Sequence, residues 1–477
     1  MFYGRKNELN RLSRLLKKKV SSLVICRGRR RIGKSTLIHQ YAKSFDQFYE
    51  FQGLAPEESN SINVQLQAFS TQLAQQTSIP ELKINSWSEA FSLLNSQIDT
   101  SKKSLIFLDE ISWMAQGEKN FSGYLKIAWD TQFKKYPNLV VVVCGSVSSW
   151  IDENILKNTG YVGRVSLDIF LEELPLYYCN CFWNGPKKKF STLEKLKTLS
   201  ITGGVPRYLE EIDITMPAET NIKSLCFSSN GFLFKEFDHM FSSLFKRKGD
   251  IYKAILNSLA AGNKTLTSVA ESLNRQKNGD FSKYLNDMEQ SGFIKNEHTF
   301  VPLNQKLSKL SKYRISDNYI RFYLRYIDPI FHNISQRHYE KASLDQIIKW
   351  DTILGIQFET LILNNTNIII QLLSIPPGTI LNASPYFQRK TNTQLACQVD
   401  LLIQSHYTLY ICEIKCKKNI GKSVINEVKS KVQKIKIPKN TSFRTVLIYE
   451  GKLSKAVVNE NYFDHLITFE DILNQPD

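Results

Sequence analysis

Residues 28–35 carry residue types and a spacing that are suited to holding phosphate. They read GRRRIGKS and match G-x-x-x-x-G-K-[ST] at every fixed position, directly after an apolar segment that is expected to be a strand. Glycines at both ends let the backbone fold around a phosphate with its N–H groups pointing inward, and a helix is expected to begin at about Lys34. Lys34 can reach the β- and γ-phosphates, and the Ser35 hydroxyl can ligate Mg²⁺. The pattern predicts a nucleoside triphosphate site formed by Gly28, Arg29, Arg30, Arg31, Ile32, Gly33, Lys34, Ser35 and, in the first helical turn, Thr36.

Two adjacent carboxylates end a second apolar segment, residues 104–110, which read SLIFLDE. Successive side chains at a strand end point in different directions. Asp109 can therefore hold the Mg²⁺ shell while Glu110 faces the attacking water as general base. The pair predicts hydrolysis in addition to binding. The alternatives are a solvated strand end here and an ordinary basic turn at residues 28–35.

A further charged group lies near the C-terminus. Residues 398–403, QVDLLI, and 409–415, LYICEIK, are separated by a polar turn and predict a hairpin of two buried strands. Glu413 and Lys415 project to one face because side chains alternate with period two, and Asp400 converges with them. Converging carboxylates repel each other unless they share a cation, so Mg²⁺ or Mn²⁺ is expected between Asp400 and Glu413, with Lys415 near the attacked phosphate.

The elements that must position the first site alternate between strand and helix. Apolar residues 48–52 and the nearly all β-branched residues 139–145 are expected to be strands, and residues 59–76 and 87–98 have helical patterns. Such an order predicts a parallel sheet with strands buried on both faces.

Six segments together resemble the archaeal-type ATPases of the STAND and AAA-related branch: FYGRKNEL, GRRRIGKST, LIFLDEISWM, CGSVSSWI, GRV at 163–165 and GGVPRYLEE at 203–211. The resemblance implies ATP with Mg²⁺, Tyr3 near the adenine, and a helical lid around residues 204–206. It also implies that Ser146 orients the lytic water, the alternative being a helix cap. Arg164 could contact the γ-phosphate in its own or a neighbouring subunit, Arg207 is the competing candidate, and each could equally be a surface arginine.

Residues 250–318 resemble a winged-helix module. Helical spacing over 250–273 is broken at Gly262, a third helix is expected at 281–292, and a small hairpin at 299–303 and 313–315. In such a module the third helix, with Lys283 and Tyr284 facing out, would lie in the DNA major groove. Carboxylates on that helix oppose phosphate, so the alternative is a spacer or protein contact. They are Asp280, Asp287 and Glu289.

The C-terminal charged group resembles the PD-(D/E)xK motif of restriction-endonuclease-like folds, with Val399 where proline is common. The resemblance implies that Glu359, in the helical residues 355–363, completes the site, and that Lys429 and Gln433 of the next basic helix contact DNA. The ATPases named above commonly carry such a domain. The alternative is a polar strand rim in an inactive nuclease-like fold.

The whole chain predicts an α/β multidomain protein. Its 477 residues suggest about three domains. The motifs divide it into a P-loop ATPase core with a parallel sheet (1–175), a helical lid (176–244), a winged helix (245–318) and a nuclease-like α/β domain (319–477). No apolar stretch reaches the roughly 20 residues of a membrane span, so we expect a cytoplasmic protein without a membrane partner. The eight cysteines form no C-x-x-C pair, which favours thiols over zinc.

The net charge of +17 favours a polyanionic partner. We therefore expect an ATPase whose nucleotide state controls a part that binds double-stranded DNA and cleaves it with metal. Homo-oligomers are compatible with the pattern. One alternative is a STAND-like switch whose nuclease-like fold only docks a partner, and another is RNA in place of DNA.

Overall fold

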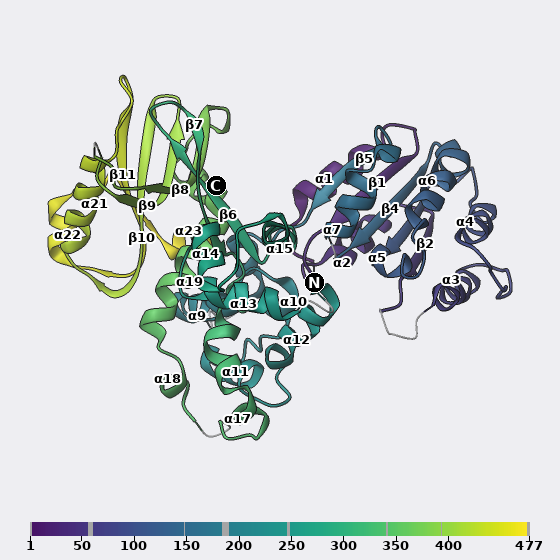
Figure 1. Ribbon diagram of the computed structural model, residues 1–477, viewed down its shortest axis with the longest axis horizontal. Coiled ribbons are helices and arrows are strands. Elements are labelled where there is room, and N and C mark those ends of the chain that lie inside the picture. Colours follow the sequence, from purple (N-terminus) through teal and green to yellow (C-terminus); the bar gives the residue numbers. More distant parts are fainter. Residues whose placement is uncertain are drawn as a thin grey trace. The chain divides into compact units, whose positions relative to one another are not determined.

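The computed structural model describes residues 2–55, 61–146, 148–183, 190–245, 249–339, 342–392 and 394–474. Contacts divide the chain into two units, residues 1–173 with 240–247 and residues 174–239 with 248–477. Figure 1 shows the elements of both units.

The first unit is built on a five-stranded sheet in the order β2-β3-β4-β1-β5, and all its strand pairs are parallel. The predicted parallel α/β architecture is confirmed. Its strands are β1 Ser22–Arg27, β2 Gln47–Gln52, β3 Ser104–Asp109, β4 Leu139–Gly145 and β5 Val165–Phe170. Its helices are α1 Lys6–Leu15, α2 Lys34–Ala42, α3 Ile62–Gln76, α4 Trp87–Ser96, α5 Ile111–Met114, α6 Phe121–Thr131 and α7 Ser148–Ile151.

The two faces of this sheet bury alternate residues of the same strands. In β4, Val141 and Val143 pack with α3, α4 and α6, whereas Val140 and Val142 pack with α1 and α2. Strands covered on both sides have to be apolar throughout, which explains the run LVVVVCG. The sheet is thereby held rigidly beneath the loops at its carboxyl edge.

The second unit begins with helices. They are α8 Leu176–Asn180, α9 Thr192–Thr202, α10 Pro206–Glu210, α11 Ala218–Cys226 and α12 Phe232–Phe245, whose last residues belong to the first unit. α9 contacts α16 (Asn318–Phe322) and α19 (Trp350–Asn364). The buried Gln357 fastens this contact, since its amide donates to the carbonyl oxygens of Ser200 and Asn318, each at 2.7 Å. The role of these helices as a lid stays a prediction.

Three helices and an antiparallel hairpin follow, in the predicted order. They are α13 Gly249–Ala260, α14 Leu266–Ser272, α15 Gly279–Gln290, β6 Ile294–Val301 and β7 Lys306–Ile315. The hairpin is longer than the pattern predicted, because β6 begins at Ile294 and β7 at Lys306. An isolated bridge joins Lys264 to Tyr313.

The C-terminal part of this unit is a mixed five-stranded sheet in the order β12-β11-β10-β9-β8, with β8, β9 and β10 antiparallel and β10, β11 and β12 parallel. Its strands are β8 Ile380–Gln388, β9 Cys397–Ser405, β10 Thr408–Ile420, β11 Ser442–Leu453 and β12 His465–Thr468. The remaining helices are α17 Phe331–Ser335, α18 Leu344–Ile347, α20 Thr366–Leu372, α21 Ser423–Lys434, α22 Lys455–Glu460 and α23 Phe469–Leu473. In Figure 1, α21 and α22 lie on one side of this sheet, and α19 and α23 on the other.

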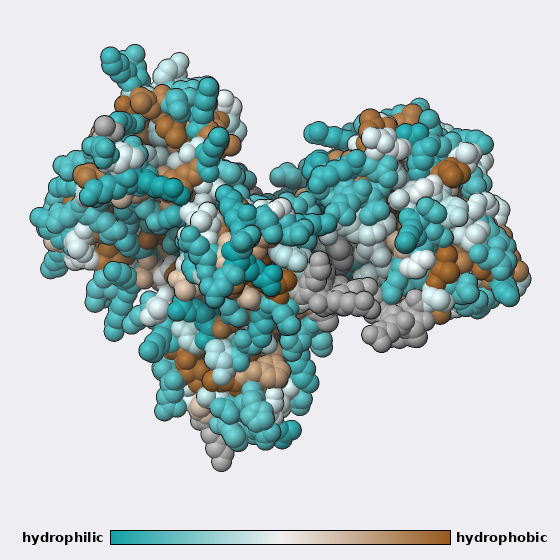
Figure 2. Space-filling model, viewed as in Figure 1, coloured by the Kyte–Doolittle hydropathy of each residue, from teal (hydrophilic) through white to brown (hydrophobic). Residues whose placement is uncertain are grey.

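Hydrophilic side chains cover most of the lobe that carries α21 and α22 on the face drawn in Figure 2. Among the described residues no single helix is long and apolar enough to cross a membrane. One bent pair, Trp350–Asn364 with Thr366–Leu372, meets the criteria of length and composition with a 74° bend.

Candidate nucleotide and carboxylate sites

The loop between β1 and α2 adopts backbone conformations that are unfavourable for residues with a Cβ atom. Gly28 has a φ of 146° and Gly33 a φ of 88°. A Cβ on Gly28 would lie 2.5 Å from the Leu171 carbonyl oxygen, so only glycine fits there. Arg31 also has a positive φ, 70°. α2 begins at Lys34, as predicted.

Lys34 is buried and its amino group lies inside the loop. It donates to the carbonyl oxygens of Gly28 at 2.9 Å and Arg29 at 3.0 Å. A second cation, Arg5, was not predicted as a site residue; its guanidinium donates to the carbonyl oxygens of Ile32 at 3.1 Å and Glu172 at 2.7 Å. Arg5 is buried, and it ties the N-terminal segment to the loop. In the sequence, Arg5 was marked only by its place in the segment FYGR, which resembles the corresponding segment of the archaeal-type ATPases.

The first turn of α2 and the carboxyl ends of β3 and β4 bring four polar side chains together in two pairs. The Ser35 hydroxyl donates to the Asp109 carboxylate at 2.6 Å. The Ser146 hydroxyl donates to the Glu110 carboxylate at 2.9 Å, and the Ser146 backbone N–H donates to the same oxygen at 3.2 Å. Glu110 has a φ of 50°, a turn that directs its side chain away from that of Asp109. One pair can share a cation and the other can hold a water.

Other residues predicted for this site lie in varied surroundings. Tyr3 is partly exposed and Thr36 is exposed. Buried Arg29 forms an ion pair with Glu173 at 3.2 Å. Arg164 forms a bidentate pair with Asp130 of α6, at 2.7 and 2.9 Å. Arg207, in the second unit, pairs with Glu210 and Glu211.

The C-terminal hairpin brings the predicted charged residues into one cluster. The Asp400 carboxylate accepts the Ile414 backbone N–H at 2.9 Å, across the β9–β10 pair. Glu413 is 1% exposed, and its carboxylate lies 2.7 Å from the Lys415 amino group. Lys415 also pairs with Glu427 of α21 at 3.0 Å.

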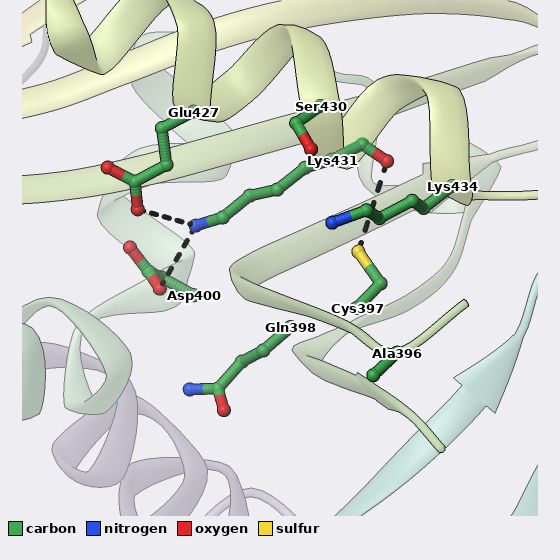
Figure 3. A pocket seen from close by; sticks show the side chains of 8 residues that line it. All are labelled: Ala396, Cys397, Gln398, Asp400, Glu427, Ser430, Lys431 and Lys434. Atoms are coloured by element: carbon green, nitrogen blue, oxygen red, sulfur yellow. Dashed lines mark hydrogen bonds and ion pairs between the residues drawn. The ribbon is translucent and has the colours of Figure 1, made fainter. Parts of the chain in front are cut away.

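Lys431 of α21 is the residue that the sequence analysis missed here. Its amino group lies 2.5 Å from Glu413, 3.4 Å from Glu427 and 3.9 Å from Asp400. It thus fills the space between the two carboxylates for which a divalent cation was expected. Figure 3 shows its amino group between Asp400 and Glu427. The helical period of the sequence could have indicated that Lys431 faces the sheet. Lys431 follows the buried Val424 and Val428 by seven and three residues, so the three side chains share one face of α21.

Burial and neighbouring charges shift the pKa values of the carboxyl and amino groups in this cluster. Burial, reinforced by the Asp400 charge, raises the pKa of Glu413 to about 7. Burial also raises the pKa of Asp400 and of Glu359, against the nearby cations. Burial lowers the pKa of Lys431, but Asp400 and Glu413 outweigh that effect and raise it overall. Burial thus makes Asp400, Glu413 and Glu359 harder to ionise, and the neighbouring cations oppose that effect.

Of the other residues predicted for this site, one lies close to the cluster and two do not. Glu359 of α19 interacts electrostatically with both Asp400 and Glu413. Lys429 turns away from Lys431, pairs with Glu460 at 2.8 Å and lies over the Tyr462 ring. Gln433 is exposed. In the described part of the chain no three His, Cys, Asp or Glu residues are close enough to hold a metal together.

Helix α15, the third of the three helices, was predicted to expose both Lys283 and Tyr284, and only Lys283 is exposed. Tyr284 packs edge-on against Tyr252 at 5.3 Å instead of facing out. Asp287 accepts the Tyr252 hydroxyl at 2.8 Å, and Glu289 accepts the Asn296 backbone N–H at 2.9 Å. Two of the three carboxylates are thus used inside the module, while Lys283 and Asp280 are exposed.

Comparison with known proteins agrees with the geometry of the first site. Residues 2–212 match the family of ATPase domains that occur predominantly in Archaea. The chain is similar to an uncharacterised protein of Methanocaldococcus jannaschii, 25% identical over 332 residues and 69% of each chain. It is also similar to a solved Walker-type ATPase of Pyrococcus abyssi, with a TM-score of 0.51, 15% identity, and coverage of 68% of this chain and 96% of that one.

A weaker likeness, TM-score 0.42 and 12% identity over 71% of this chain and 95% of that one, is to the ORC2 protein of Aeropyrum pernix. The N-terminal part therefore resembles an archaeal-type ATPase domain over residues 2–212, and the likeness to the Pyrococcus protein shows a shared fold.

Proposed function

We propose that the first unit binds ATP with Mg²⁺ at residues 28–36 and hydrolyses it. The observation that carries this proposal is the 2.6 Å hydrogen bond from the Ser35 hydroxyl to the Asp109 carboxylate. It lies next to the phosphate loop, and the Lys34 amino group already points into that loop. A Mg²⁺ ion would sit between that hydroxyl and carboxylate, and Lys34 would exchange its loop carbonyls for phosphate oxygens.

In the same proposal, Glu110 is the general base and Ser146 holds it in position. The Ser146 hydroxyl and N–H both bond to one Glu110 oxygen, which leaves the other oxygen available to a water. Arg164 would have to leave Asp130 before it could contact a γ-phosphate.

We further propose that the nucleotide state controls a second unit that binds DNA and cleaves it with a divalent metal. The support is the convergence of Asp400, Glu413 and Lys415 in one partly buried cluster, with Glu359 close enough to influence their charge. Asp400 and Glu413 would ligate Mg²⁺ or Mn²⁺, and Lys415 would stabilise charge on the phosphate. The three-helix segment with its hairpin would act as a winged helix.

One observation favours a second candidate, a nucleotide-driven switch that docks a partner without cutting it. Lys431 neutralises the two carboxylates without any metal. A docking domain needs no metal, and an ammonium group held there would keep one out.

Incubation of plasmid DNA with the full-length protein, ATP, and Mg²⁺ or Mn²⁺ tests these proposals on one gel. Wild type is compared with Lys415→Ala and Lys34→Ala. Cleavage that is lost in Lys415→Ala supports the nuclease, and dependence on Lys34 supports its control by ATP. If wild type cuts under no condition, the nuclease proposal is wrong and the switch remains.

A further inference from the structure

Three neighbouring hollows lie along the second unit, and they share walls. The first, of about 390 Å³, is lined by Asp400, Lys431 and Lys434 among others. The second, of about 300 Å³, shares residues 396–398 with it. The third, of about 380 Å³, shares Leu310 and residues 387–389 with the second. Together they form one groove that runs from hairpin strand β7, across β8 and β9, to α21.

The hairpin end of this groove is fastened to the sheet end. The buried Thr299 hydroxyl of β6 donates to the Phe387 carbonyl at 3.1 Å and accepts the Phe387 N–H at 2.9 Å. The Gln404 amide of β9 donates to the Pro302 carbonyl at 3.4 Å. At the other end, the Gln388 amide donates to the Lys434 carbonyl at 3.2 Å. The groove is therefore a fixed surface built by the hairpin, the sheet and α21.

Cations without carboxylate partners line its length. They are Lys309 and Lys312 of β7, Arg389 after β8, and Lys434 of α21. Within the described part of the chain, none of the four forms an ion pair. Burial and the charge of Arg389 lower the pKa of Lys312, as expected where like charges are crowded.

The carboxylates of the groove lie only at its α21 end. Asp400 and Glu427 are there, and Lys431 lies between them (Figure 3). Lys434 projects from α21 and Gln398 from β9 into the same hollow (Figure 3). A polyanion that followed the cations of β7 and β8 would reach Asp400.

We propose that this groove holds one sugar-phosphate backbone of double-stranded DNA and leads it to the Asp400–Glu413 cluster. The inference rests on the proposed DNA-binding function and names the surface that performs it. Lys309, Lys312 and Arg389 contact successive phosphates, and Lys434 contacts a phosphate next to Asp400.

The duplex is favoured over an unpaired strand because the groove offers no ring for base stacking. Its two aromatic side chains, Tyr386 and Phe387, are 6% and 4% exposed. The Lys312 amino group covers the Phe387 ring at 4.3 Å from its centroid. Proteins that hold unpaired strands present open aromatic faces. A groove of cations alone suits a backbone whose bases stay paired.

Fluorescence anisotropy with a short labelled DNA duplex tests the groove in the full-length protein. The variant Lys312→Gln/Arg389→Gln is compared with Lys417→Gln/Lys418→Gln, which removes the same charge from exposed positions of β10 outside the groove. We expect the groove variant to bind at least about tenfold more weakly than the control. We also expect its slope of log K against log salt to fall by about two, roughly one for each lost phosphate contact.

Equal weakening by both double variants would overturn the proposal, because binding would then follow net charge alone. A single strand that binds wild type more tightly than the duplex would overturn the assignment of the occupant. If wild type binds neither, the proposed DNA-binding function itself is wrong.

A second variant guards against misfolding around the half-buried Lys312. Lys309→Gln/Arg389→Gln changes two exposed residues of the same groove. It should keep the wild-type thermal transition and still lose affinity and salt slope. If it matches wild type in affinity, the groove does not bind the backbone.

Discussion

Lys431 carries its ammonium group into a cluster of three carboxylates, and burial makes two of them, Asp400 and Glu413, hard to ionise. Asp400, Glu413 and Glu427 all lie within 4 Å of it. In the nucleotide site, by contrast, Lys34 is held by neutral carbonyl oxygens. A carbonyl releases a cation to an incoming phosphate more readily than a carboxylate does. The two sites therefore differ in how strongly their own lysine opposes a ligand.

Replacing Lys431 by Met should raise the affinity of the C-terminal cluster for Mn²⁺ by about tenfold or more, since the change removes the cation that lies between Asp400 and Glu413 and leaves only Lys415 paired with Glu413. Isothermal titration of the full-length protein without nucleotide measures this. Lys429→Met, on the same helix but paired with Glu460, is the control and should leave the affinity unchanged. Unchanged affinity in Lys431→Met would mean that no metal competes for its position.

Binding of Mn²⁺ to the wild-type cluster should strengthen from about pH 6 to about pH 8. The pKa of Glu413 is raised to about 7, so below that pH the carboxyl group holds a proton and ligates poorly. The apparent affinity should rise by up to roughly tenfold per pH unit below the pKa and level off above it. Titrations at three pH values measure the trend, and a flat profile contradicts the role of Glu413 as ligand.

In the nucleotide site, Glu110→Gln should keep ATP binding and lower turnover by about 10²–10⁴-fold, because the amide accepts no proton from water. Lys34→Ala should weaken ATP binding itself. Equilibrium binding of a fluorescent ATP analogue and phosphate release separate the two effects. Normal hydrolysis by Glu110→Gln would show that another group is the base.

Among the elements, the hairpin of β6 and β7 is bound to the sheet by very few hydrogen bonds, and Thr299 makes two of them. Its hydroxyl serves both backbone groups of Phe387 at the end of β8, where no other described strand pairs on that side. The Thr299 side chain thus replaces the backbone hydrogen bonds that a neighbouring strand would make to Phe387. The continuity of the groove depends on this junction.

Thr299→Val keeps the shape of the side chain and leaves the Phe387 N–H without its acceptor, at a cost of about 1–3 kcal/mol. Hydrogen–deuterium exchange of the peptide that contains Phe387 should accelerate, while peptides of β1 stay unchanged. Thr408→Val, at an exposed hydroxyl pair with Ser442, is the matched control and should change little. Equal protection of Phe387 in both variants would mean that the hairpin is held by its packing.

For the whole molecule, the proposals join an ATPase unit to a basic unit in one chain of net charge +17. A charge of that size attracts any nucleic acid at low salt, so binding alone says little about control. Control requires that ATP and ADP change the affinity by different amounts.

The affinity of the full-length protein for DNA should differ by about 5–150-fold between ATP and ADP, the usual range of coupling between two sites. Glu110→Gln in ATP provides a stable loaded state for this measurement, by anisotropy at near-physiological salt. Lys34→Ala should show one affinity in both nucleotides. Equal affinities in Glu110→Gln with ATP and with ADP would mean that the two units act independently.

The sequence by itself determined the phosphate loop, the strands that flank it and the order of three helices and a hairpin over residues 249–315. These features are local: glycine spacing, β-branched runs and helical periodicity depend on neighbours within one element. The contact of Ser146 with Glu110 also follows, because the carboxyl ends of the adjacent parallel strands β3 and β4 meet at one edge.

The tertiary structure alone decided the contacts that join distant segments. It brought Lys431 between Asp400 and Glu413, paired Arg164 with Asp130, and aligned β7, β8 and α21 along one groove. Each of these depends on how elements far apart in the chain pack against one another. Periodicity shows which face of an element is buried, but it does not name the residue that will lie opposite.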